Sequence, residues 1–341
     1  MLVLTNGLAE TPDEGFLKVA NNLIKRLKEN CKDVEVVSFE RNSAIADTCI
    51  KPNKLLLDKC VREVCSRHNS LLYVPFPTRK WVMALRVYVL SKYIKKVNVV
   101  LVLKTPIGVI SRFLLKQSGA NIIVLSRDAA EFYGKVVGES RIRYVNAGVD
   151  INRFVPVSRE RSSELKKKYG FDPQKIVVLH VGHLNEGRNL RQLQKLCNDY
   201  QILIVASTQT KSESDTKLKS DLLSKRNVII IDKYVPNIQE LYQLADVYFF
   251  PVTQSGHCID APLSCLEAAA CGKPVVTTSY GEMREFKGKS GFWFIESFEP
   301  DYLNSLIFNA ACDCDQNPRN AVAIYDWGCA VQKLRSFLEG E

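Results

Sequence analysis

The chain has 341 residues, more than one hydrophobic core usually supports, and this length predicts two domains. Hydrophobic residues make up 46% and charged residues 25%, a composition that excludes a disordered, collagen-like or coiled-coil protein. No apolar run approaches the ~18 residues of a membrane-spanning helix. The start, MLVLTNG, lacks the basic residues of a secretory leader, so we expect a cytoplasmic protein.

Positive charge is concentrated in the first half of the chain. Residues 1–150 contain 24 Lys and Arg against 14 Asp and Glu, whereas the rest of the chain has equal numbers of both signs. This asymmetry indicates an anionic partner for the first half, such as a membrane surface, a phosphorylated substrate or nucleic acid. A diffuse, solvated basic surface is the alternative.

The cysteines and histidines do not form a metal-binding pattern. Cys312 and Cys314 form a C-x-C pair, but no second pair lies at a matching distance. His180 and His183 are spaced like zinc ligands, yet no further ligands follow at the required spacing. We therefore expect no metal site and no cofactor, with reduced and buried thiols.

Short apolar segments alternate with helical patterns along the chain. In the first half, strands are predicted at 2–5, 34–39, 71–76, 97–103 and 121–126, with a helix running through Phe16 and Leu27. The alternation stops over 146–173 and then resumes, with strands at 175–184, 201–207, 227–231, 246–252 and 273–278 and a helix at 236–245. Continuous β-branched runs between helices predict parallel sheets that are buried on both faces.

Two such alternations predict an α/β protein with two Rossmann-like domains that face a central cleft. We place the first domain at 1–148, a linker at 149–173, the second domain at 174–325, and a terminal helix at 326–341 that crosses back to the first domain. Ligands bind beyond the carboxyl ends of the strands in such sheets. The loops after the strands are therefore the places to look for chemistry.

The segment 251–278 predicts a helix whose amino terminus binds phosphate. Ser255 and Gly256 follow a strand, Asp260 is expected to cap a helix that begins at Pro262, and Gly272 ends it. The free amides and the positive dipole end of such a helix favour an anion.

Glu267 lies within this helix among leucine and alanine residues. A carboxylate in an apolar helix is rarely buried without a partner, and a ribose or sugar diol is one such partner. A solvated helix face is the alternative for Glu267.

The segment 180–190, HVGHLNEGRNL, again follows a strand. Gly182 permits a close approach of the backbone, and Arg188 can bind phosphate in a bidentate manner. His183 can donate to an anion when it is protonated. A surface arginine and a structural histidine are the alternatives, and His180 is expected to be a core histidine.

These two segments resemble the retaining GT-B glycosyltransferases of the family-four type, which includes glycogen synthase and mannosyltransferases. The matching stretches are GHLNEGR at 182–188 and EAAACGKPVV at 267–276, with NAGVDINRF at 146–154 as a further match. The resemblance covers nearly the whole chain and is strongest in the second half. It implies the transfer of a hexose from a UDP- or GDP-sugar to an acceptor, with retained anomeric configuration and without a metal.

The resemblance also implies roles for individual residues. Arg188, Asp260 and Glu267 would be catalytic: Arg188 would grip the diphosphate, and Glu267 would hold the ribose hydroxyls. Ile259 stands where the family has its first acid, and Asp260 is expected to substitute for it. The implied donor-binding set is Gly7, Gly182, His183, Arg188, Tyr234, Val235, Ser255, Gly256, Asp260, Ala261, Pro262, Leu263 and Glu267.

The acceptor is expected to be a glycan or a lipid-linked or polyanionic molecule. The stretch 79–96 has the pattern of a basic helix with apolar residues, which can lie on anionic lipid at the inner face of the membrane. A core-facing helix is the alternative.

Two other functions stay open at this stage. The first keeps the GT-B fold but makes the chain an epimerase, a phosphorylase or an inactive binding homologue, because the first acid is altered. The second is a basic nucleic-acid-binding protein. No helix-turn-helix, zinc-finger or RNA-binding pattern is present, so we expect no nucleic-acid partner.

Overall fold

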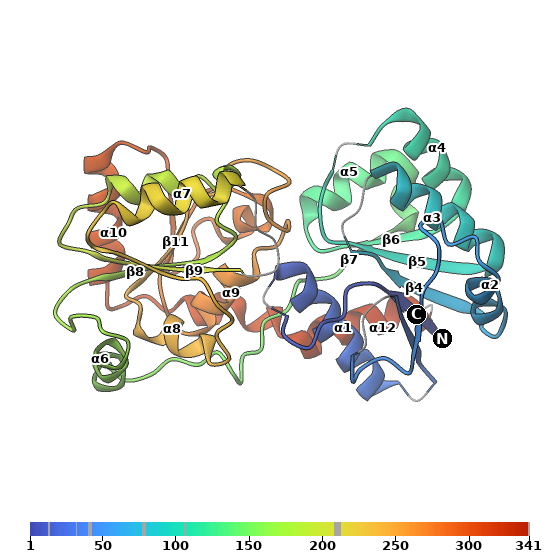
Figure 1. Cartoon of the computed structure of the whole chain (residues 1–341), viewed down its shortest axis with the longest axis horizontal. Helices are drawn as coiled ribbons and strands as arrows, with labels where there is room; N and C mark the ends of the chain where they lie inside the picture. Colours follow the sequence, from blue (N-terminus) through green and yellow to red (C-terminus); the bar gives the residue numbers. More distant parts are fainter. Residues whose placement is uncertain are drawn as a thin grey trace. The chain divides into compact units, whose positions relative to one another are not determined.

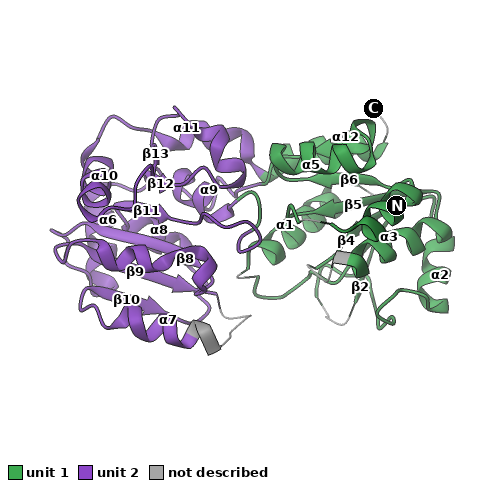
Figure 2. Cartoon of the chain, turned by 90° about the horizontal axis from the view of Figure 1, so that it is seen from above, with its two compact units in different colours: residues 1–147, 259–261, 327–341 green, residues 148–258, 262–326 purple. Residues whose placement is uncertain are grey.

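The computed structural model describes residues 1–12, 14–31, 33–39, 43–76, 80–105, 107–207 and 213–339, so Arg79 of the predicted basic helix lies outside the described residues. The chain divides into two compact units (Figure 2). Unit 1 comprises residues 1–147, 259–261 and 327–341, and unit 2 comprises residues 148–258 and 262–326. Each unit is built on its own parallel sheet.

The sheet of unit 1 has the strand order β3-β2-β1-β4-β5-β6-β7, and every pairing in it is parallel. Its strands are β1 (Leu2–Thr5), β2 (Glu35–Phe39), β3 (Thr48–Ile50), β4 (Ser70–Val74), β5 (Lys96–Leu101), β6 (Asn121–Val124) and β7 (Ile142–Tyr144). Its helices are α1 (Gly15–Asn30), α2 (Lys59–Ser66), α3 (Lys80–Tyr93), α4 (Val109–Ser118), α5 (Arg127–Val137) and α12 (Trp327–Glu339). Figure 1 shows α3, α4 and α5 on one face of this sheet and α1 with α12 on the other.

The sheet of unit 2 has the strand order β10-β9-β8-β11-β12-β13, again with parallel pairing throughout. Its strands are β8 (Val177–Gly182), β9 (Gln201–Ala206), β10 (Val228–Ile231), β11 (Val247–Phe250), β12 (Val275–Thr277) and β13 (Phe292–Phe294). Its helices are α6 (Arg159–Lys168), α7 (Glu213–Leu223), α8 (Ile238–Leu244), α9 (Leu263–Ala270), α10 (Pro300–Cys312) and α11 (Pro318–Val322). In Figure 1, α7 and α10 cover one face of the sheet, and α8 and α9 cover the other.

Burial of both sheet faces explains the continuous apolar strands. The strands β1 and β11 are buried along their whole length, and their side chains pack into cores formed with the flanking helices. A parallel strand between two helical layers has no solvent-facing side, so it needs apolar residues at every position rather than at alternate ones. The short strands β3, β7 and β13 were not predicted, because three residues are too few to give a pattern.

The segment 149–173 is part of unit 2 and contains the helix α6. Ser158 caps this helix, because its hydroxyl accepts the N–H of Arg161 at 3.2 Å. Lys166 then anchors α6 to the sheet through a 2.7 Å ion pair with Asp246, directly before β11. The charged residues that predict a linker therefore form a helix that packs beside α8 in unit 2.

The predicted basic helix over 79–96 corresponds to α3, which ends at Tyr93, and Lys96 already belongs to β5. Its residues Val82 and Leu90 are buried in the core. Arg86 is buried as well and donates its Nε–H to the carbonyl of Lys54 at 2.8 Å. The structure therefore supports the core-facing alternative for this helix.

All eleven cysteines are free, and four of them, Cys49, Cys312, Cys314 and Cys329, are exposed, so the expectation of buried thiols is wrong for these four. Over the described residues, no helix combines the length and the apolar character needed to cross a bilayer.

Candidate functional site

The candidate site lies where the strand order of unit 2 reverses. The chain runs from β8 outward to β9 and β10 on one side, and then returns to place β11, β12 and β13 on the other side of β8. The loops that follow neighbouring strands β8 and β11 therefore diverge at the carboxyl edge of the sheet, which is the usual ligand position in open α/β sheets. These two loops hold the predicted residues Arg188 and Ser255.

Arg188 lies against the backbone of Gly182. The residue belongs to the short 3-10 helix η2 (Glu186–Arg188), whose first turn is held by the Asn185 side chain, which accepts the Arg188 N–H at 3.1 Å. A Cβ on Gly182 would stand 2.8 Å from Cζ of Arg188 and would overlap Nη1. Gly182 also has φ +151°, a conformation that favours glycine. Glycine at 182 thus provides the space that the guanidinium occupies.

Arg188 is a buried cation without a protein counter-charge among the described residues. It is only 6% exposed, and no carboxylate of the described chain lies within ion-pair distance of it. Its Nε–H has no hydrogen-bond partner in that part of the chain. Buried charges are normally paired, so this arrangement indicates an anionic ligand.

The charge of Arg188 acts on residues from three elements. Burial and, to a smaller extent, Arg188 lower the pKa of His180 in β8 to about 3, so this histidine is neutral. The same charge opposes the rise that burial causes in the pKa of Tyr248 in β11 and of Cys265 in α9. The charge of Arg188 is therefore felt in β8, β11 and α9 of unit 2.

His180 occupies the core, as predicted, and links β8 to β11. Its Nδ1 makes a 2.9 Å hydrogen bond with the carbonyl of Phe249, which assigns the proton to Nδ1. Its ring is stacked near the rings of Tyr248 and Phe250. Its Nε2 has no hydrogen-bond partner among the described residues, so only one of the two ring nitrogens is hydrogen-bonded there.

Asp260 does not cap the helix that was predicted to bind phosphate, which corrects the prediction. The helix α9 starts at Leu263, with Pro262 in the N-cap position and no side-chain cap. Asp260 belongs to unit 1, where its N–H donates to the carbonyl of Val102 at 3.1 Å and its carboxylate accepts the N–H of Lys104. The helix start of α9 therefore lacks a carboxylate cap that would compete with an anion.

Glu267 is buried in α9, as its apolar neighbours indicate, and it has a protein partner. The hydroxyl of Tyr242 in α8 donates to it at 2.7 Å. Tyr242 is fully buried, and this burial, together with the charge of Glu267, raises the pKa of the phenol well above its usual value. Sequence reasoning missed this pair, because residues 25 positions apart on two helices show no local signal.

His257 is a further residue of the site that sequence reasoning missed. It is exposed in the loop after β11, and its imidazole lies over Gly187, where a Cβ would overlap the ring. Gly187 directly precedes Arg188, so His257 lies beside the β8 loop. The only signal for His257 in the sequence is its position two residues after Ser255, a predicted donor-binding residue.

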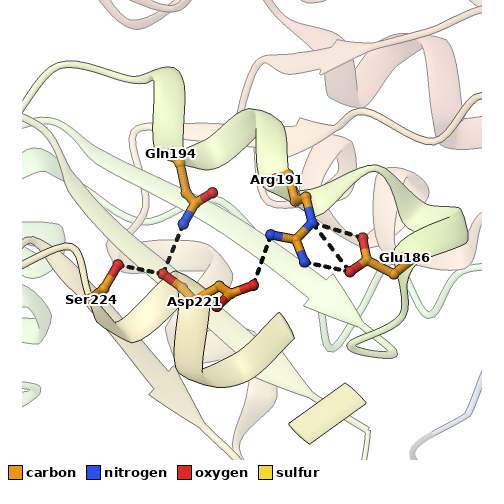
Figure 3. A network of polar contacts seen from close by, with 5 residues as sticks. All are labelled: Glu186, Arg191, Gln194, Asp221 and Ser224. Carbon is orange, nitrogen blue, oxygen red and sulfur yellow. Dashed lines mark hydrogen bonds and ion pairs between the residues drawn. The ribbon is translucent and has the colours of Figure 1, made fainter. Parts of the chain in front are cut away.

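Arg191 connects the β8 loop to α7 (Figure 3). Its guanidinium binds both oxygens of Glu186 and also Asp221, with an Nη2–Oε1 distance of 2.6 Å and an Nη1–Oδ2 distance of 2.9 Å. Gln194 and Ser224 both donate to the carbonyl of Asp221. Arg191 belongs to the next 3-10 helix, η3 (Leu190–Lys195), and the network ties it to Glu186, the first residue of η2. The network thus positions the turn that carries Arg188.

The remaining predicted residues are divided between the two units. Unit 2 contains His183, which is half-buried in the β8 loop, the exposed residues Ser255 and Gly256, and buried Leu263 at the start of α9. Tyr234 and Val235 follow β10 at the same edge of the sheet, where Tyr234 is exposed.

Gly7, Asp260 and Ala261 belong to unit 1. Gly7 follows β1, and its N–H donates to the hydroxyl of Thr5 at 2.9 Å. A Cβ on Gly7 would stand 2.7 Å from Cζ of Phe16, so the ring of Phe16 covers this glycine. Gly7 therefore lets α1 approach the end of β1.

Comparison with known proteins relates part of the chain to a known family. The model of the family described as "Glycosyl transferases group 1" matches residues 175–307, a range that includes Arg188, His257 and Glu267. The crystal structure of Anabaena Alr3699/HepE in complex with UDP covers 100% of this chain and 99% of its own, with a TM-score of 0.75 and 15% identity. Residues 175–307 therefore match the group 1 glycosyltransferase family, and the whole chain has the two-domain GT-B fold.

Two curated relatives are similar to parts of this chain. A GDP-mannose-dependent monoacylated alpha-(1-6)-phosphatidylinositol monomannoside mannosyltransferase of Corynebacterium glutamicum is 25% identical, over 68% of this chain and 66% of that protein. The putative glycosyltransferase YtcC of Bacillus subtilis is 28% identical, over 42% of this chain and 38% of that protein. The GT-B chain thus spans less than two thirds of each relative. The predicted fold, with two Rossmann-like domains, is confirmed, and the predicted resemblance to the glycosyltransferase family is supported over residues 175–307.

Proposed function

We propose that this GT-B chain transfers a hexose from a UDP- or GDP-sugar to an acceptor, with retention of anomeric configuration and without a metal. The observation that carries the proposal is the buried Arg188, which lies where the strand order of unit 2 reverses. Among the described residues, no carboxylate forms an ion pair with it. The donor type is supported by a relative named as GDP-mannose-dependent and by a structural neighbour in complex with UDP.

The donor diphosphate would be held by groups from the two loops and from α9. Arg188 supplies a permanent charge, His257 and His183 supply imidazole N–H groups, and the uncapped start of α9 supplies backbone amides. Cleavage of the bond between the sugar and the diphosphate places negative charge on the phosphate oxygen. Donors already oriented toward that charge stabilise the transition state more than the ground state.

Glu267 would hold the ribose hydroxyls through the carboxylate that Tyr242 orients. A phenol that donates at 2.7 Å fixes the rotamer of the acid before the nucleotide arrives. Such preorganisation reduces the entropy that is lost on binding.

The acceptor is proposed to be a lipid-linked glycan or another polyanionic molecule. Support comes from the charge of the first half of the chain, which has an excess of ten basic residues. The curated relative named for a phosphatidylinositol monomannoside acceptor points in the same direction.

A thermal-shift panel tests the donor site. UDP, GDP, ADP and their sugars are added to wild type, to Arg188→Ala and to Arg226→Ala, a control that removes an exposed arginine of the same unit. We expect one nucleoside diphosphate to raise the melting temperature of wild type and of the control but not of Arg188→Ala. The same response in all three proteins would contradict the role of Arg188.

The reaction is tested with the responding sugar nucleotide and candidate acceptors. Product NMR reports the anomeric configuration, and activity is compared with and without a chelator. Binding without transfer to any acceptor would favour an inactive binding homologue, and isomerised donor would favour an epimerase. Stabilisation by oligonucleotides alone would favour nucleic-acid binding.

A further inference from the structure

An unusually exposed apolar surface lies on α4 of unit 1. Val109, Ile110 and Phe113 are 84%, 73% and 60% exposed. Residues three and four positions apart share one face of a helix, so these three side chains form one stripe, here called the α4 patch. Trp81 is also exposed and lies at the start of α3, the helix that packs along α4 (Figure 1).

The surroundings of the α4 patch are basic. Arg112 and Lys116 are exposed on α4 itself, and the helix contains no acidic residue. In the wider sequence, the 64 residues from Val64 to Arg127 contain 11 Lys and Arg and no Asp or Glu. This segment supplies β4, α3, β5, α4 and β6, and it accounts for the positive charge of the first half.

An apolar stripe with a cationic rim matches one class of partner best. Nucleic acid would pair with the lysines and arginines but would leave Val109 and Ile110 in water. A second copy of the chain would bring two basic faces together, which is electrostatically unfavourable. An anionic bilayer offers acyl chains for the stripe and headgroup phosphates for the rim.

We propose that the α4 patch docks this chain on an anionic lipid bilayer. Val109, Ile110 and Phe113 enter the boundary between headgroups and acyl chains, while Arg112 and Lys116 contact lipid phosphates. The docking does not require catalysis, whereas the corollary that the acceptor is a membrane lipid rests on the proposed function. The proposed membrane contact is therefore on α4, and not on the preceding helix over 79–96 that the sequence predicted.

Vesicle sedimentation tests the docking. Wild type is mixed with vesicles of phosphatidylcholine alone or of phosphatidylcholine with phosphatidylglycerol, at low and at high salt. We expect binding to the anionic vesicles only, and weaker binding at high salt. Equal binding to both kinds of vesicle, or to neither, overturns the proposal.

Matched variants locate the surface. Phe113→Ser should weaken binding about tenfold, because it removes a large apolar side chain from the patch. Phe308→Ser is the control, since Phe308 is 53% exposed on α10 of unit 2 and should not affect binding. The pair Arg112→Gln and Lys116→Gln should weaken binding at low salt more than at high salt. Equal effects of the two phenylalanine variants would overturn the assignment to α4.

Two further measurements separate this proposal from others. Light scattering without lipid reports the oligomeric state. If the wild type is a dimer that Phe113→Ser dissociates, and no vesicle binding is seen, the patch belongs to a contact between two copies and the proposal is overturned. The nucleotide thermal shift is repeated on each variant. Vesicle binding without any nucleotide response would refute the proposed function and leave the docking intact. A nucleotide response without vesicle binding would refute the docking and leave the proposed function intact.

Discussion

The guanidinium of Arg188 occupies the space in which residue 182 would carry a side chain, with Cζ 2.8 Å from the position of the absent Cβ. Gly182 ends β8 and Arg188 lies six positions later, and the turn of η2 folds the arginine back over the glycine. The buried cation of the site therefore depends on a glycine. Gly182 and Arg188 should consequently respond to substitution as a pair.

Gly182→Ala should displace Arg188 and abolish nucleotide binding. The added Cβ overlaps the guanidinium, and φ of +151° is unfavourable for alanine, so we expect at least a tenfold loss of donor affinity and a stability loss of about 1–3 kcal/mol. Calorimetric titration with the responding nucleotide measures the affinity. Gly108→Ala is the control, since nothing lies within 4 Å of its Cβ position. Unchanged affinity in Gly182→Ala would show that the site does not need this position of Arg188.

His257→Ala should lower donor affinity by about threefold to tenfold, the range expected for one lost hydrogen bond. Gly187→Ala should have a similar effect, because its Cβ displaces the His257 ring. The double variant should resemble His257→Ala alone, since removing the ring makes room for the Cβ. Affinities of the four proteins form a double-mutant cycle, and additive losses would mean that the two residues act separately.

Tyr242→Phe should destabilise unit 2, because the buried carboxylate of Glu267 loses a hydrogen bond of 2.7 Å. We expect the free energy of unfolding to fall by about 1–3 kcal/mol, measured by calorimetry. Tyr169→Phe is a matched control: it removes a bond of the same length to Glu240, but in a more exposed place, so it should cost less. A larger loss in Tyr169→Phe would contradict the importance of burial.

The stability of unit 2 should fall as the pH is lowered from about 6.5 toward 3. Burial first, and the charge of Arg188 second, lower the pKa of His180 to about 3, against an ordinary value of 6.5. Between these values the unfolded chain binds a proton that the folded chain does not, which costs up to about 1.4 kcal/mol per pH unit. Denaturant titrations should show a shallower pH dependence in His180→Gln than in wild type. Parallel curves would mean that His180 does not titrate on unfolding.

Local patterns in the sequence were sufficient for most strands and for the resemblance to the family. Continuous apolar runs such as VNVVL at 97–101 predicted buried parallel strands, because a strand between two helical layers has no polar side. The stretch GHLNEGR at 182–188 identified the loop with Arg188, since a strand followed by a glycine and a cation is a local signal. The short strand β13 was missed, because its three residues are recognisable only by their pairing with β12.

The tertiary structure alone decided which distant residues meet. The sequence determined two alternations of strands and helices, a late helix with a buried acid, and an excess of positive charge in the first half. Only the folded chain showed that β8 lies beside β11 and that Tyr242 donates to Glu267. It also showed that the carboxylate of Asp260 accepts the backbone N–H of Lys104 rather than capping α9. Spacing along a helix or strand is encoded within a few residues, whereas contacts between elements depend on strand order, which local spacing does not specify.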